Sequence, residues 1–158
     1  MVSNENMGFS LPRGATGFYR PKDGHLPETD LGAFRGALYA AARAAGGKVG
    51  EVEKQAYPRT FHTASVRDGA EEPIILCHVY HPWIAFVQRL GDWQSEEFVA
   101  PPPWASSFEH AGFVALARRQ LATGLTDLDT SGLSQSEWRE IRYSGVTTLG
   151  GVIFNAWD

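Results

Sequence analysis

Cysteine and histidine side chains gather in the middle of the chain, where Cys77 and His78 are neighbours and His62 and His81 lie nearby. A cysteine and a histidine together can form a nucleophile and its base. If residues 74–80 form a strand, Cys77 and His78 point to opposite faces, so the base would have to come from His62 or His81. Because cysteine is among the most often buried residue types, a packed core cysteine is the favoured interpretation.

His78 and His81 also have the H-x-x-H spacing of some metal-binding pairs. Zinc needs at least a third protein ligand, and residues three apart on a strand do not share a face, so no metal site is predicted. The sequence contains no phosphate-binding loop, dinucleotide fingerprint or nucleophile elbow. No cofactor is therefore predicted, and a non-catalytic protein is favoured over an enzyme.

One candidate pocket remains as an alternative to a protein-binding role. His62 lies among the small polar residues of segment 60–65 and could line a sheet-lined pocket together with His78 and Tyr80. A small enzyme or a small-molecule-binding protein would use such a pocket. The same alternation of residues is also typical of the solvated side of a sheet.

Acidic residues form two groups that could bind a protein partner. Glu51 and Glu53 make one group, and Asp68, Glu71 and Glu72 make the other. The chain has 14 Lys and Arg against 18 Asp and Glu, a net charge of −4, and no basic stripe of the kind that nucleic-acid binders use. We therefore expect no nucleic-acid binding, and an acidic surface that either steers a basic partner or is simply solvated.

Two tryptophans are expected in loops, Trp93 after a Gly-Asp pair and Trp104 after three prolines. Exposed tryptophans beside acidic residues are typical anchors of protein interfaces. The alternative is that both cover the edges of the core beneath the loops.

Hydrophobic periodicity and turn signals predict the elements that would position these residues. Residues 31–45 carry an apolar stripe at helical spacing, after Asp30 as N-cap and before two glycines. Strands joined by short turns are then expected as an antiparallel meander, at residues 49–55, 60–67, 74–80, 83–90 and a brief 97–100.

Capping-box sequences predict two further helices. One begins at Ser106 and extends to Gly124, and a shorter one begins at Ser134 and ends near Tyr143. Residues 148–158 fit a helix or a strand, and the helix is favoured.

These elements describe one α+β domain over residues 1–158. It has a single antiparallel sheet of four to five strands, with three to four helices packed mainly on one face and residues 1–28 as an irregular arm. The single cysteine excludes an intrachain disulfide. With no signal peptide and no apolar run long enough to span a bilayer, we expect a cytoplasmic protein without membrane contact.

The final residues, TLGGVIFNAWD from Thr148 to Asp158, support a family resemblance. They resemble the T-hydrophobic-G-x-V-hydrophobic-F-N-x-W-D ending of small actinobacterial proteins, some of which are similar to immunity proteins of polymorphic toxin systems. Gly151 stands at the x position, where a polar or acidic residue is expected. The resemblance implies a protein that binds and neutralises a cognate toxin without catalysis, and leaves its oligomeric state open.

Overall fold

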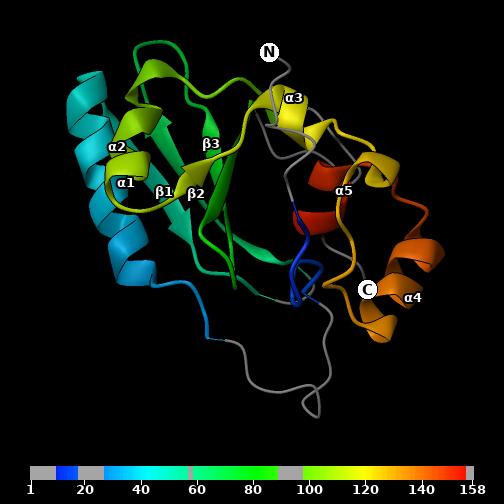
Figure 1. The fold of residues 1–158 in the computed structure, drawn as a ribbon. Helices are drawn as coiled ribbons and strands as arrows, with labels where there is room; N and C mark the ends of the chain where they lie inside the picture. Colours follow the sequence, from blue (N-terminus) through cyan, green and yellow to red (C-terminus); the bar gives the residue numbers. More distant parts are fainter. Residues whose placement is uncertain (1–9, 18–26, 57–58, 89–97, 156–158) are drawn as a thin grey trace.

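The computed structural model describes residues 10–17, 27–56, 59–88 and 98–155 (Figure 1). In chain order the described elements are α1 (Leu31–Ala45), β1 (Lys48–Glu53), β2 (Phe61–Arg67), β3 (Ile74–His78), β4 (Trp83–Val87), β5 (Phe98–Val99), η2 (Pro103–Ala105), α2 (Ser106–His110), β6 (Val114–Ala115), α3 (Arg118–Leu121), η3 (Leu125–Asp127), α4 (Gln135–Ser144) and α5 (Leu149–Ile153). None of the helices in these ranges combines the length and the apolar character needed to cross a bilayer.

The sheet follows the predicted meander. Strands β1 to β5 lie in chain order, and each pairs antiparallel with the next, which confirms the brief fifth strand. An unpredicted strand, β6, pairs parallel with β4. The sheet is therefore mixed, and the prediction of a purely antiparallel sheet is wrong at this one edge.

Helices cover both faces of the sheet, so the prediction that they pack mainly on one face is wrong. Figure 1 shows α1 and α2 on one side, and α3, α4 and α5 on the other. The reason lies in β3, where Ile75 and Cys77 pack toward α1 while Leu76 packs into the core on the opposite side. A strand that is apolar on both faces needs cover on both.

The first helix forms as its sequence predicts. Asp30 accepts a hydrogen bond from the backbone N–H of Ala33 at 3.2 Å, and Gly46 ends the helix with a φ of 68°. The apolar stripe of α1 is buried against the sheet through Phe34, Ala37, Leu38, Ala41 and Ala42. This stripe supplies the core on one face.

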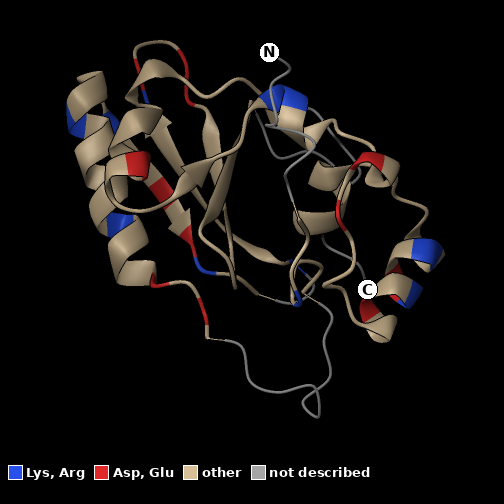
Figure 2. Cartoon of the chain, viewed as in Figure 1, with Lys and Arg blue, Asp and Glu red and all other residues tan. Residues whose placement is uncertain are grey.

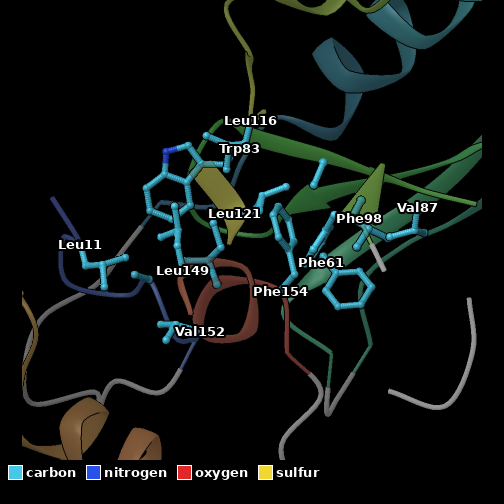
Figure 3. Packing of buried hydrophobic residues seen from close by; sticks show 14 of the residues in the cluster. Leu11, Phe61, Trp83, Val87, Phe98, Leu116, Leu121, Leu149, Val152 and Phe154 are labelled. Carbon is cyan, nitrogen blue, oxygen red and sulfur yellow. The ribbon is translucent and has the colours of Figure 1, made fainter. Parts of the chain in front are cut away.

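The opposite core brings the two ends of the described chain together (Figure 3). Leu11, from the segment before α1, packs there with Leu149 and Val152 of α5 and with Phe154. Strand residues complete this core, among them Phe61, Leu76, Trp83, Val87 and Phe98.

The helix predicted from Ser106 to Gly124 is wrong. Helix α2 ends after one turn, and Gly112 follows with a φ of 95°, which L side chains rarely adopt. The chain then pairs with β4, because the Val114 and Leu116 N–H groups donate to the Pro82 and Ile84 carbonyls. In this segment Phe113 packs in the core toward α1, Leu116 and Leu121 pack in the opposite core, and Val114 is exposed.

The two capping-box predictions have opposite outcomes. The box at Ser106 is wrong, because α2 continues from η2 and has no side-chain cap. The box at Ser134 is confirmed at the start of α4. The Ser134 hydroxyl accepts a hydrogen bond from the Glu137 N–H, and the Glu137 carboxylate accepts one from the Ser134 N–H. The helix favoured for the final segment is confirmed over Leu149–Ile153, with Thr148 as its N-cap, while residues 156–158 lie outside the described residues.

Candidate functional site

An open groove lies over β1 and β2 on the side of the sheet that faces away from α1. Val52 and Ala64 pack toward α1, so their strand neighbours Glu53 and Thr63 point the other way. The groove has a volume of about 580 Å³. Its lining residues are Gly50, Glu51, Glu53, Thr63, Ala64, Ser65, Arg67, Glu72 and Ile74.

A bulge in β1 shapes one wall of the groove. Val49 pairs with Val66 and Val52 with Ala64, so β1 contains one residue more than β2 over the same stretch. At Gly50, within the bulge, an added Cβ would collide with Ser65 Oγ and Glu72 Oε2. A glycine here therefore allows these two side chains to lie against the β1 backbone.

The Glu72 carboxylate is held in place at the groove. Ser65 Oγ donates to Glu72 Oε2 at 2.7 Å, and Arg67 Nε donates to Glu72 Oε1 at 3.3 Å. The Ser65 hydrogen bond, followed by the bond from Arg67, lowers the pKa of Glu72 below its usual value. Glu72 thus remains ionised at neutral pH.

The groove carries more negative than positive charge, with three glutamates against one arginine in its lining. Glu53 pairs with Arg59 at 3.5 Å, and both side chains are exposed by a third or more. Such exposed ion pairs contribute only about 0 to 1 kcal/mol to stability. An incoming cation can therefore replace Arg59 at Glu53 with little loss of free energy. Within the described residues, Glu51 has no ion-pair partner.

The structure brings only three of the five predicted acidic residues into this groove, namely Glu51, Glu53 and Glu72. Asp68 and Glu71 instead close the β2–β3 turn through their backbone groups. Glu71 lines a neighbouring hollow of about 350 Å³. Figure 2 shows acidic residues along β1 and at that turn, basic residues on α3, and residues of both charges on α4.

Trp104 is a core residue, so its interpretation as an exposed anchor is wrong. Only 6% of its surface is exposed, and its ring lies 5.6 Å from that of Phe86. Its indole Nε1–H donates to Asp68 Oδ2 at 3.3 Å, which satisfies the one polar group of the side chain. Trp93, the other predicted anchor, lies outside the described residues.

The residues of the alternative pocket are not brought together. His78 pairs with Phe61 in the sheet register, and both contact Phe154 in the core away from α1. His62, the next residue on β2, points to the opposite face and stacks on Phe34 of α1 at 6.5 Å. Tyr80 stays near His78, with ring centroids 6.4 Å apart. The sheet therefore separates His62 from the other two.

His78 has a structural role that explains its burial. Its Nδ1 accepts hydrogen bonds from the Tyr80 and His81 N–H groups at 3.1 and 3.2 Å, which fixes the β3–β4 turn. This leaves the proton on Nε2, which donates to the Ala15 carbonyl at 2.8 Å. The imidazole thus joins the turn to the segment before α1.

Cys77 is fully buried on the α1 side of the sheet. Burial raises the pKa of its thiol to about 12, so the thiolate needed for nucleophilic chemistry does not form at neutral pH. In the described part of the chain, no three His, Cys, Asp or Glu side chains are arranged to hold a metal ion.

Of the residues that line the groove, only the three glutamates were predicted from the sequence, and the six others include Gly50, Thr63 and Ser65. The two hydroxyls belong to the polar alternation that had suggested a pocket around His62. They face the groove, whereas His62 faces α1. The alternation of polar residues did indicate a pocket, but the pocket lies on the face of β2 opposite to His62.

No protein-family model matches this chain, and neither the curated proteins nor the solved structures searched gave a significant match. The resemblance of residues 148–158 to immunity-like proteins therefore stays a prediction.

Acidification should destabilise the fold through its buried histidines. Burial lowers the pKa of His78 from 6.5 to about 3, and burial also lowers the pKa values of His62 and His81. A group whose folded-state pKa is depressed contributes stability above its unfolded pKa and loses it as the pH falls. For His78 we expect a loss of about 2 kcal/mol between pH 7 and pH 5.

Urea unfolding at these two pH values measures the effect. His78→Gln keeps a hydrogen-bond donor and acceptor but does not titrate, so its pH dependence should be weaker by that amount. An equal pH dependence in the variant and the original chain would contradict a neutral His78.

Proposed function

We propose that this chain is a non-catalytic cytoplasmic protein that binds and neutralises a cognate bacterial toxin. The observation that carries the proposal is the open groove over β1 and β2, with Glu51, Glu53 and Glu72 around it. An acidic surface of this kind fits a basic protein, since complementary charge raises association rates and rejects acidic competitors.

The groove would form one part of a larger interface. A stable protein interface buries about 800 Å² on each partner, more than one groove of this size supplies. The outer edge of β1 has no strand neighbour among the described residues. A partner seated on the groove can extend along this edge and toward the β2–β3 turn.

The C-terminal residues support the proposal through their resemblance and not as a contact surface. Leu149, Val152, Ile153 and Phe154 are buried in the core. We therefore place recognition at the groove and assign residues 149–155 to stability. Nothing in the geometry favours the alternative pocket of His62, His78 and Tyr80, whose members the sheet divides.

Parallel purification from the native host tests the proposal. The original chain is compared with Glu51→Gln/Glu53→Gln and with a charge-matched control, Glu109→Gln/Glu140→Gln, whose side chains lie on α2 and α4. We expect mass spectrometry to find a basic protein with the original chain and the control, reduced at least tenfold for the groove variant.

Equal recovery of that protein by the groove variant would contradict a role for the groove. Recovery of the chain without a protein partner, but with a bound small molecule, would contradict the function itself.

A further inference from the structure

We infer that the groove receives an arginine side chain of the partner, held by the β1 carboxylates and by the hydroxyl of Thr63. The inference deepens the proposed function and rests on it for the source of the arginine. It begins from a polar group at the groove that makes no hydrogen bond among the described residues.

Thr63 is that group. Only 5% of the residue is exposed, and it lines the groove. No hydrogen bond to its hydroxyl occurs among the described residues, whereas the hydroxyl of Ser65 on the same face donates to Glu72. Among the described residues, the one side-chain N or O atom that is both fully buried and unbonded is His62 Nε2, so the Thr63 hydroxyl stays accessible from the groove. A group bound in the groove can therefore donate a hydrogen bond to it.

The neighbours of Thr63 indicate the chemistry of that donor. Glu53 pairs directly with Thr63 across the β1–β2 register, and Glu51 precedes it on β1. Two carboxylates beside a free hydroxyl form a set of acceptors, which selects a cation with several N–H groups. Ile74, at the inner wall, offers an apolar surface to the carbon stem of a long side chain.

Arginine satisfies these conditions better than lysine or a metal ion. Its planar guanidinium presents five donors and can bind a carboxylate with two parallel hydrogen bonds. The charge on lysine is compact and more strongly hydrated. The groove already accommodates this chemistry at its margins, where Arg59 and Arg67 pair with Glu53 and Glu72.

Titration of the isotope-labelled chain with N-acetylarginine amide tests the inference by NMR. N-acetylcitrulline amide is the neutral probe of the same shape. We expect saturable shifts of the Thr63 and Ser65 amide signals with arginine, with a dissociation constant of about 1 mM, and none with citrulline. Added salt should weaken the binding.

Three variants locate the contact. Thr63→Val removes the hydroxyl at nearly constant shape, and Glu51→Gln/Glu53→Gln removes the charges. Each should weaken arginine binding at least threefold. Thr63→Ser should retain the affinity of the original chain, as should Glu109→Gln/Glu140→Gln.

Equal shifts with arginine and citrulline, or unchanged affinity in Thr63→Val, would overturn the inference. These outcomes are separate from those of the purification. Arginine binding without a protein partner would support the inference and contradict the proposed function. Partner capture through Glu51 and Glu53 without arginine binding would support the proposed function and contradict the inference.

Discussion

Replacing Glu137 with alanine is expected to lower the free energy of unfolding by about 3 to 5 kcal/mol, because buried donors would lose their acceptor. Glu137 has no exposed surface, although it belongs to the first turn of α4. Its Oε1 accepts hydrogen bonds from the Gly14 N–H at 3.0 Å, from the Thr16 N–H at 3.2 Å and from the Thr16 hydroxyl at 2.7 Å.

The other oxygen of Glu137 has a separate task. Oε2 accepts a hydrogen bond from the Ser134 N–H at 3.2 Å, which completes the capping box of α4. One carboxylate thus begins a helix and fixes segment 10–17 against the core. The S-x-x-E sequence pattern predicts the capping of α4, whereas only the fold reveals the bonds to segment 10–17.

Chemical denaturation of Glu137→Ala measures the loss. Glu140→Ala is the matched control, because it removes the same side chain from the same helix at a partly exposed position with no such bonds among the described residues. The control should stay within about 0.5 kcal/mol of the original chain. A Glu137→Ala loss as small as that of the control would contradict the anchoring role.

The Phe154→Ala variant should lose about 3 to 5 kcal/mol, the usual cost of emptying a buried phenylalanine site. Phe154 is 3% exposed and lies about 6 Å, between ring centroids, from Phe61, His78 and Phe98. Figure 3 shows it near Phe61 and Phe98. The loss would open the core that joins α5 to the sheet.

Thermal unfolding checks this prediction, with Tyr143→Ala as a control at a side chain on α4 that is 87% exposed. A melting temperature unchanged in Phe154→Ala, together with weaker partner binding, would show that the segment belongs to an interface. That result would contradict the assignment of residues 149–155 to the core.

Asn155 shows why the C-terminal segment is distinctive. Its Nδ2 donates to the Thr16 carbonyl at 3.0 Å and to the Val152 carbonyl at 2.7 Å. Its backbone N–H donates to Thr60 Oγ1 at 3.1 Å, and its carbonyl accepts from the Thr60 N–H. The residue therefore ties α5 to Thr60, directly before β2, and to segment 10–17, a role that no local pattern reveals.

Elements with local signals were predicted well from the sequence. Helix α1 has its cap, stripe and terminal glycine within 17 residues, from Asp30 to Gly46. The strands of the meander are separated by turn residues, and α4 begins with a complete capping box. In each case the forces that fix the element act between residues close in the chain.

The errors arose where distant contacts decide the outcome. Phe113 and Leu116 fit one helical stripe. This segment instead pairs with β4, and the two side chains pack in opposite cores. Trp104 follows three prolines as a loop residue would, yet Asp68 on another turn binds its indole. Local propensity is a weak prior when tertiary pairing offers more hydrogen bonds and burial.

The candidate site shows the same division. The acidic residues were visible in the sequence, but their separation depends on the β2–β3 turn, which Asp68 and Glu71 close, and on the β1 bulge at Gly50, against which Glu72 lies. Thr63 and Ser65 acquire their places from the strand register, which sets the face that each residue presents.

We propose that the groove over β1 and β2 neutralises a toxic basic protein, and a growth assay tests this most directly. The partner recovered by purification is expressed in a bacterial host together with the original chain, with Glu51→Gln/Glu53→Gln or with Glu109→Gln/Glu140→Gln. We predict that the partner alone stops growth, that the original chain and the control restore it, and that the groove variant fails although it folds. Growth restored equally by the groove variant, or a partner without toxicity, would contradict the account.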